Sequence, residues 1–216
     1  MADREAGPVR MVATLGFAGM ASGFALVGIF LVTQPRIERN RAEALEAAIF
    51  QVLRGAAERV TLVEREGALR PLENPEDAVP GEEAVYAGYD GAGEFLGYAI
   101  VAEGPGFQDA IKLIYGYEPT RGRVVGMRVL ESRETPGLGD KIAKDEAFLE
   151  NFRDLSVAPE VVAVKKGRQR DNEIDAISGA TISSVAVARI INLANARWVE
   201  RLPPPDAAAE SVRKGG

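Results

Sequence analysis

The chain has 216 residues, of which 46% are hydrophobic, and it carries a formal net charge of −6 without a single cysteine or histidine. Disulfides, thiol catalysis and cysteine-ligated iron–sulfur centres are therefore excluded, as are Ser-His-Asp triads and zinc or haem sites with histidine ligands. The length suits one domain of ordinary size plus an appendage, and the negative charge argues against nucleic acid as a partner.

The first predicted element is a membrane helix. Residues 11–34 contain no charged side chain, and as a helix this run would be about 36 Å long, enough to cross a hydrocarbon core of about 30 Å. It is too long for the apolar part of a typical signal peptide, and no small-x-small cleavage site follows it. We therefore expect an uncleaved anchor behind a short N-terminal segment, residues 1–10.

Two features of this anchor leave alternatives open. Gly19 and Gly23 form a G-x-x-x-G step, which favours close approach of another helix, although glycines are frequent in membrane helices generally. For the orientation, two arginines lie in the N-terminal flank and three in the C-terminal flank, namely Arg4 and Arg10 against Arg36, Arg39 and Arg41. The positive-inside rule then leans weakly towards a cytoplasmic domain, but a difference of one charge decides little.

After the anchor, the residue pattern predicts an α+β domain over residues 36–202. Apolar residues recur at helical spacing over 37–54, 144–155 and 183–202. Strands are expected at 59–65, 83–89, 94–102, 110–117, 123–131 and 159–165, with hairpin turns at 90–93 and 118–122. Loops at 71–80 and 166–172 and a flexible tail at 203–216 complete the pattern. Antiparallel strand pairs with helices at the ends indicate an antiparallel sheet with flanking helices.

One segment of this domain stands out for its small and hydroxyl-bearing residues: Asp175 to Ser184 reads DAISGATISS. Gly179 permits a tight or left-handed backbone, and Thr181, Ser183 and Ser184 are common at helix starts. A helix N-terminus presents unpaired N–H groups and partial positive charge, and therefore suits a phosphate. On spacing alone, an ordinary helix N-cap is the simpler interpretation.

A second segment, Glu134-Thr135-Pro136-Gly137-Leu138-Gly139, lies earlier in the chain. Taken together, Asp-x-x-Ser-Gly-Ala-Thr and this second segment resemble the flavinylation motif and the flavin loop of FMN-binding domains in bacterial membrane redox complexes. The family includes the G subunit of the Rnf complex and the C subunit of the sodium-pumping NADH:quinone reductase. The resemblance extends from the apolar N-terminus to Leu202 and is closest to the G subunit.

The resemblance implies a covalent FMN, bound through a phosphoester to Thr181, the residue that closes the motif. A separate flavin transferase with FAD as donor would make the bond. The cofactor-binding residues that it implies are Thr181, Ser178, Gly179, Ala180, Ser183, Glu134, Thr135, Pro136, Gly137, Leu138, Gly139, Lys141 and Gly106. Neither catalytic side chains nor a metal site is expected. Many relatives have a histidine where Arg133 stands here, so no role is assigned to that position.

The same resemblance implies a single-pass protein of the bacterial inner membrane with a cytoplasmic N-terminus and a periplasmic domain. Its partners would be lipid and the other membrane and peripheral subunits of an Rnf-type complex. Such complexes exchange electrons between ferredoxin and NAD while they move sodium ions or protons, and this chain would relay electrons within one.

Two other functions are weighed against this hypothesis. An anchored assembly or binding module would use the Ser-Gly-Ala-Thr segment only as a helix cap, and flavin fluorescence of the denatured protein separates the two cases. A hydrolase would use Ser183 or Ser184 as nucleophile, but the chain contains no histidine to serve as its ordinary base.

Overall fold

The computed structural model describes residues 7–65, 67–72 and 83–204, and the chain divides into two compact units, Met1–Ala44 and Leu45–Gly216. Parts of three predicted segments lie outside the described residues. They are the first six residues of the N-terminal segment, residues 73–80 of the loop at 71–80, and residues 205–216 of the tail.

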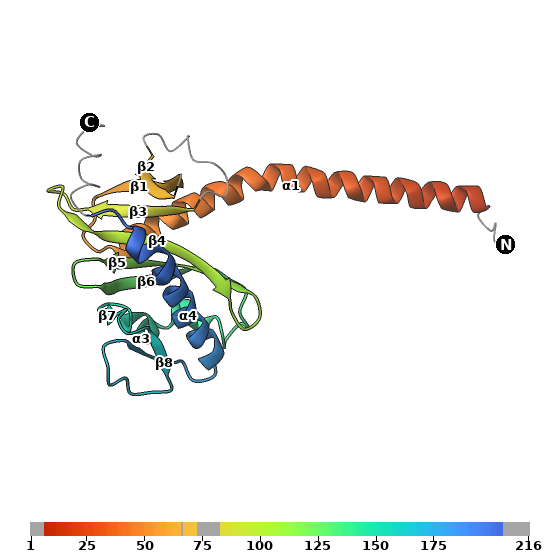
Figure 1. Ribbon diagram of the computed structural model, residues 1–216. Coiled ribbons are helices and arrows are strands. Elements are labelled where there is room, and N and C mark those ends of the chain that lie inside the picture. Colours follow the sequence, from red (N-terminus) through yellow and green to blue (C-terminus); the bar gives the residue numbers. More distant parts are fainter. Residues whose placement is uncertain (1–6, 66, 73–82, 205–216) are drawn as a thin grey trace. The chain divides into compact units, whose positions relative to one another are not determined.

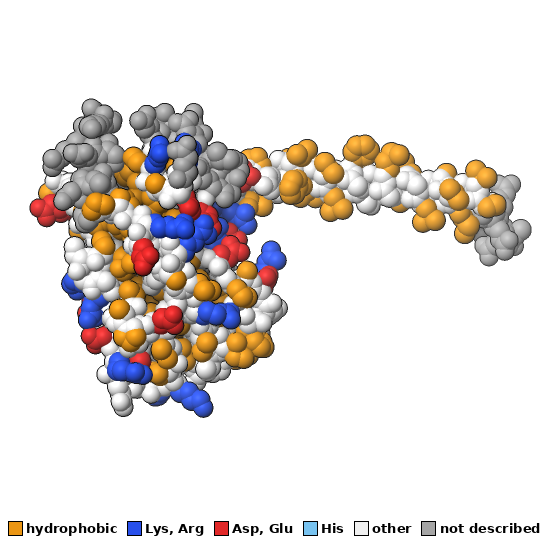
Figure 2. All heavy atoms as spheres, in the orientation of Figure 1, with side chains coloured by type: hydrophobic (Ala, Val, Ile, Leu, Met, Phe, Trp, Pro, Cys, Tyr) orange, Lys and Arg blue, Asp and Glu red, His pale blue; other side chains and the backbone are white. Residues whose placement is uncertain are grey.

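The first unit contains the apolar part of helix α1, which runs over Pro8–Val52 without interruption. Among the described residues α1 is the one helix long and apolar enough to cross a membrane, and its apolar window is not buried inside the protein. Residues 11–34 of this helix include no charged residue, and Figure 2 shows hydrophobic side chains along the helix. The hydroxyls of Thr14 and Thr33 bond to the carbonyls of Arg10 and Ile29 at 2.6 and 2.8 Å, so the helix satisfies them internally.

The sequence predicts two helices here, broken near Pro35, whereas the structure has one. Proline lacks the N–H that would bond to the carbonyl of Leu31, but its fixed φ is compatible with a helix. Membrane helices tolerate such a position because other groups can satisfy the freed carbonyl. The proline therefore costs one hydrogen bond without ending α1.

The second unit is built on a seven-stranded sheet with the order β2-β1-β3-β4-β5-β6-β7, in which all neighbours are antiparallel (Figure 1). Its strands are β1 (Glu58–Arg65), β2 (Ala68–Pro71), β3 (Ala84–Tyr89), β4 (Phe95–Pro105), β5 (Ala110–Glu118), β6 (Arg123–Ser132) and β7 (Leu155–Ser156). A separate parallel pair consists of β8 (Val162–Val164) and β9 (Glu173–Asp175). The helices are α2 (Lys141–Lys144), α3 (Glu146–Glu150) and α4 (Thr181–Trp198), the last followed by a 3₁₀ turn at Val199–Arg201. The predicted α+β class is confirmed.

The sheet has a hydrophobic cluster on each face, because successive side chains of a strand point to opposite sides. On one face α4 buries the predicted stripe, Val187, Ile190, Ile191, Ala194 and Trp198, against a cluster that includes Ile100 and Tyr115. On the other face the end of α1 buries Ile49, Val52 and Leu53 against Ala99 and Ile114. The domain therefore consists of a sheet between two helical layers.

A row of glycines lets the end of α1 lie directly on the sheet. Gly88, Gly97, Gly116 and Gly126 stand on four successive strands, where Gly88 pairs with Gly97 and Gly116 with Gly126. A Cβ at Gly116 would lie 2.6 Å from the carbonyl oxygen of Val52, and one at Gly126 would lie 3.0 Å from the same oxygen. A Cβ at Gly116 or Gly126 would push the helix from the sheet, whereas one at Gly88 would overlap the Leu53 side chain and one at Gly97 would lie 2.7 Å from the carbonyl oxygen of Tyr117.

Three predicted elements differ from the structure. The helix expected at 144–155 is split into α2 and α3, because Asp145 is extended (φ −79°, ψ 106°) and its carboxylate caps α3 by accepting from the amides of Ala147 and Phe148. Its expected end, Leu155, pairs with Val124 in β7 instead. The strand expected at 159–165 is confined to β8, and the helix expected at 183–202 begins earlier, at Thr181.

Candidate functional site

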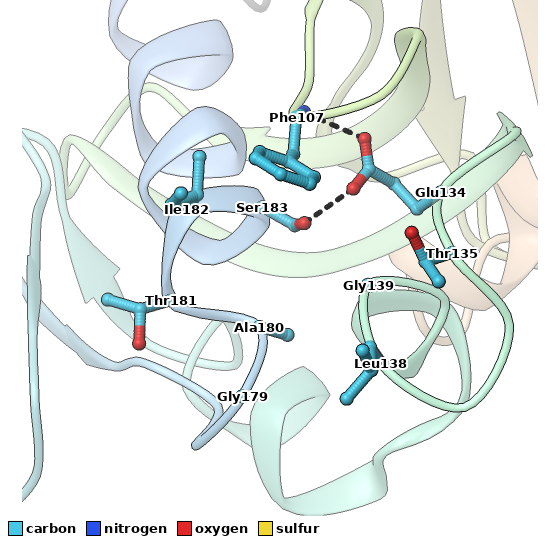
Figure 3. Close-up of a pocket in the computed structure, with 10 residues that line it drawn as sticks. All are labelled: Phe107, Glu134, Thr135, Leu138, Gly139, Gly179, Ala180, Thr181, Ile182 and Ser183. Atoms are coloured by element: carbon cyan, nitrogen blue, oxygen red, sulfur yellow. Dashed lines mark hydrogen bonds between the residues drawn. The ribbon is translucent and has the colours of Figure 1, made fainter.

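A cavity of about 410 Å³ lies where three segments of the second unit meet. The segments are the turn between β4 and β5, the loop between β6 and α2, and the end of the β9–α4 loop together with the first turn of α4 (Figure 3). The lining residues are Phe107, Glu134, Thr135, Leu138, Gly139, Gly179, Ala180, Thr181, Ile182 and Ser183. The volume falls within the roughly 300–1,000 Å³ of small-molecule sites. The two sequence motifs therefore form one pocket.

The other predicted site residues lie around this pocket without lining it. Ser178, Pro136 and Gly137 lie in the adjacent loops, and Lys141 is the exposed first residue of α2. Gly106 lies in the β4–β5 turn, where its amide donates to the carbonyl of Asp109 at 2.9 Å. These residues shape or border the pocket walls rather than form them.

Two lining residues are missing from the sequence prediction, Phe107 and Ile182, and both are exposed apolar side chains. Their exposed fractions are 63% and 59%, and Leu138 across the pocket is 49% exposed. A signal existed for Phe107, because an aromatic residue directly after Gly106 suits a binding segment as well as a plain connection between strands. Three large apolar side chains around one cavity offer the kind of walls that a flat aromatic ring requires.

Glu134 is a buried carboxylate, with 5% of its surface exposed. Its Oε1 accepts from the amides of Phe107 and Gln108 at 2.8 and 3.1 Å, and its Oε2 accepts from the Ser183 hydroxyl at 2.6 Å. Burial alone would raise the pKa of this carboxyl, but the hydrogen bonds from Ser183, Gln108 and Phe107 outweigh it and leave the pKa lowered. Glu134 therefore stays ionised and bonds to the protein itself.

Glycines allow the loops to approach this carboxylate and each other. A Cβ at Gly139 would lie 2.6 Å from Oε2 of Glu134 and 3.0 Å from the hydroxyl oxygen of Ser183. Gly137 and Gly179 have φ of +77° and +84°, a region that favours glycine. Gly139 is thus required for steric reasons, and Gly137 and Gly179 are favoured by their backbone conformation.

The structure separates the three hydroxyls of the second motif. Ser183 and Ser184 are buried. Ser183 donates to Glu134, and Ser184 donates to the carbonyl of Ala180 at 2.9 Å and accepts from the amide of Ile177 at 3.1 Å. Thr181 is exposed at the pocket, with only a long 3.5 Å contact to the carbonyl of Ile177. Of the three hydroxyls, only that of Thr181 is therefore exposed to solvent and lacks a short hydrogen bond.

The interpretation of this segment as an ordinary N-cap is wrong. The capping position of α4 belongs to Ala180, and no side chain makes a cap hydrogen bond there. The first amides of a helix have no partner within it, and they carry the positive end of its dipole. Thr181, the first residue of α4, thus stands where an anionic group is stabilised.

Comparison with known proteins agrees with this geometry. The family described as the FMN-binding domain matches residues 106–196, a range that contains every lining residue of the pocket. The second unit thus contains an FMN-binding domain.

Relatives define the protein more narrowly. The G subunit of the ion-translocating oxidoreductase complex of Methanosarcina acetivorans is 30% identical over 86% of this chain and 91% of its own length. The G subunit of the Na⁺-translocating ferredoxin:NAD⁺ oxidoreductase complex of Acetobacterium woodii is 32% identical over 75% of this chain and 77% of its own length. The chain belongs to this family of G subunits.

A solved structure shares the fold. The C subunit of the Na⁺-translocating NADH-quinone reductase from Parabacteroides distasonis aligns with a TM-score of 0.57 and 20% identity, over 78% of this chain and 97% of that one.

Proposed function

We propose that this protein is a membrane-anchored, electron-carrying member of an Rnf-type complex and that it holds FMN in the pocket between the two motifs. Family membership supports the type of complex, and the relative from Acetobacterium woodii is named for ferredoxin:NAD⁺ oxidoreduction with sodium translocation. When bound, FMN accepts and donates electrons singly or in pairs. The protein then supplies binding and position, and the other subunits of the complex supply donor and acceptor.

The residues of the pocket suit FMN. Phe107, Leu138 and Ile182 provide apolar surface for the ring system. Gly139 brings the main chain close to the cavity, and the first amides of α4 suit the phosphate. We therefore assign the binding of FMN to the lining residues, with Gly106, Pro136, Gly137 and Ser178 as supports of their loops. Lys141 lies outside the lining, and we propose no more than a long-range charge effect for it.

We further propose that FMN is attached covalently to Thr181. The observation that carries this assignment is the separation of the hydroxyls, since Ser183 and Ser184 are buried and bonded whereas Thr181 is exposed. In the reaction, Oγ1 of Thr181 forms a bond to the FMN phosphorus of FAD, the pyrophosphate P–O bond breaks and AMP leaves. The hydroxyl proton passes to a base of a flavin transferase.

The anchor completes the proposal. Residues 11–34 of α1 would span the bilayer, residues 1–10 would lie in the cytoplasm, and the FMN-binding domain over residues 36–202 would lie on the periplasmic side of a bacterial inner membrane. A reporter enzyme fused to the N-terminus should then give a cytoplasmic signal. A periplasmic signal would reverse this topology.

The attachment is tested by substituting the hydroxyl of Thr181. Thr181→Val keeps the branched shape and removes the oxygen, so a protein made together with its transferase should fold and show no covalent flavin in its intact mass. Thr181→Ser should retain at least partial labelling. Ser183→Ala and Ser184→Ala are the matched controls and should stay labelled.

The outcomes separate the proposals. A flavin on Thr181→Val, or an adduct that peptide mapping places on Ser183 or Ser184, refutes the attachment residue. A wild-type protein that binds no flavin, covalent or dissociable, refutes the electron relay and favours the anchored assembly module.

A further inference from the structure

We propose that Glu134 is a positioning residue of the pocket, because its carboxylate bonds to two neighbouring walls of the pocket. One wall is the β4–β5 turn with Phe107, and the other is the first turn of α4 with Ser183. This inference rests on the proposed FMN site and deepens it. It assigns to Glu134, besides its place in the pocket lining, the task of holding the backbone of Phe107 and the start of α4 in position.

The first argument is where the two oxygens point. Oε1 accepts from two successive backbone amides, those of Phe107 and Gln108, and Oε2 accepts from Ser183 (Figure 3). Successive amides that converge on one anion form a strong binding arrangement, and hydrogen bonds to a charged acceptor are about twice as strong as neutral ones. The bonded partners lie 26, 27 and 49 residues away in the sequence. One side chain therefore joins two distant segments.

The second argument is steric. A Cβ at Gly106 would lie 2.4 Å from Oε1, and a Cβ at Gly139 would lie 2.6 Å from Oε2. Each oxygen thus has a glycine against it, one in the β4–β5 turn and one in the loop that contains Glu134. The carboxylate and its Ser183 partner account for glycine at position 139, whereas a Cβ at Gly106 would also lie 2.6 Å from the carbonyl oxygen of Asp109 and 2.8 Å from Cδ1 of Ile111.

The third argument concerns the other side-chain contacts of the β4–β5 turn. Thr135 donates to the side-chain oxygen of Gln108 at 3.0 Å, and Arg133 pairs with Asp109 at 3.4 Å. The ion pair is exposed, with 86% of the Arg133 side chain accessible, and exposed pairs contribute little. Arg189 of α4 also donates to the carbonyl of Pro105, and the Gly106 amide donates to the carbonyl of Asp109, but the Phe107 side chain is largely exposed and its own backbone amide bonds to Glu134.

The test compares three variants of the full-length protein in detergent, made without a transferase and therefore free of covalent flavin. Glu134→Ala removes both acceptors, and Glu134→Gln keeps the shape but exchanges one acceptor for a donor and removes the charge. Arg133→Ala is the control, because it removes the exposed ion pair between Arg133 and Asp109 of the same turn. The readout is amide hydrogen exchange, followed on peptides that cover residues 105–110 and 181–184.

We expect exchange at the Phe107 and Gln108 amides to rise at least about tenfold in Glu134→Ala, with an intermediate rise in Glu134→Gln. The start of α4 should follow, while β4, β5 and the rest of α4 keep their protection and Arg133→Ala matches the wild type. If Glu134→Ala unfolds, the exchange rates of Glu134→Gln alone test the proposal. A uniform rise across the domain means a merely structural role and overturns the proposal, as does unchanged exchange in the turn.

A second readout uses protein made with the transferase. If the pocket walls become more mobile in Glu134→Gln, iodide should quench a flavin on Thr181 more strongly in this variant than in the wild type or Arg133→Ala. The visible circular dichroism of the flavin should also change. Equal quenching in all three proteins refutes the role of Glu134 in positioning the pocket walls around the cofactor. A wild-type protein without flavin instead refutes the proposed function, and the exchange experiment still decides whether Glu134 holds the pocket.

Discussion

The substitution Gly139→Ala tests how tightly the pocket is packed around Glu134. The new Cβ would lie 2.6 Å from Oε2 and 2.8 Å from Cβ of Glu134, and 3.0 Å from the Ser183 hydroxyl oxygen. Carbon contacts are most favourable near 3.5–4.0 Å, so atoms must move by roughly half an ångström or more. Glu134 cannot yield cheaply because three donors hold it. Overpacking of this kind costs about 1–3 kcal/mol, and each kcal/mol lowers Tm by about 2–4 °C in a domain of about 150–250 residues.

The assay is thermal unfolding of the full-length protein in detergent, followed by circular dichroism. Gly91→Ala is the matched control, because no heavy atom lies within 4 Å of its Cβ position in the β3–β4 turn and its φ is not in the left-handed region. The control should change stability by no more than about 0.5 kcal/mol, as surface substitutions usually do. If Gly139→Ala unfolds at the wild-type temperature, the packing argument around Glu134 is wrong.

Three further predictions concern the anchor and the buried carboxylate. Removal of residues 1–35 should leave a soluble, folded fragment, since the buried core begins with Ala48 and Ile49; an insoluble fragment would contradict the domain boundary. Gly23→Leu should weaken co-purification with membrane subunits by blocking close helix approach, and unchanged co-purification would mean that this face contacts lipid. The pKa of Glu134 is lowered in the folded protein, so its stabilisation is present above the ordinary pKa of a glutamate and is lost as the pH falls through the folded value. In urea unfolding between roughly pH 6 and pH 3, the wild type should therefore lose more stability than Glu134→Gln, and equal losses would exclude this effect.

Local signals in the sequence are sufficient for much of the fold. The turn at 90–93 is predicted correctly because Asp90 and two glycines favour it, and Asp90 indeed accepts from the amides of Ala92 and Glu94. The buried stripe of α4 is predicted correctly because its apolar residues repeat at helical spacing. By contrast, Phe148, Phe152 and Leu155 also have helical spacing, yet Leu155 joins the sheet. The partner of a sheet residue is distant in the chain, and periodicity carries no information about it.

For the site, too, the sequence predicts the local features but not the contacts between distant segments. Glycines and hydroxyls at fixed spacing locate both motifs, but the side of the pocket that each residue occupies depends on how the loops meet. Glu134 is expected from the motif to lie against the cofactor, and it does line the pocket, but the motif does not indicate that its carboxylate also bonds to Ser183 and to backbone amides. Ile182 is missed because an exposed apolar residue outside a periodic stripe has no distinctive pattern, whereas Phe107 is missed because its glycine-aromatic segment suits a plain connection between strands equally well. Their role becomes visible only with the shape of the cavity.

The glycine row beneath the end of α1 also bears on how this protein can vary. Adjacent strands are about 4.8 Å apart, so neighbouring positions in the row lie well inside the distance at which mutational effects stop being additive. An alanine at Gly116 must displace Val52, and once that helical turn has moved, an alanine at Gly126 meets less of it. The double variant should therefore be less damaged than the sum of the single variants. Such positive epistasis means that the first replacement of a glycine in the row lowers stability the most, and that each later replacement lowers it less.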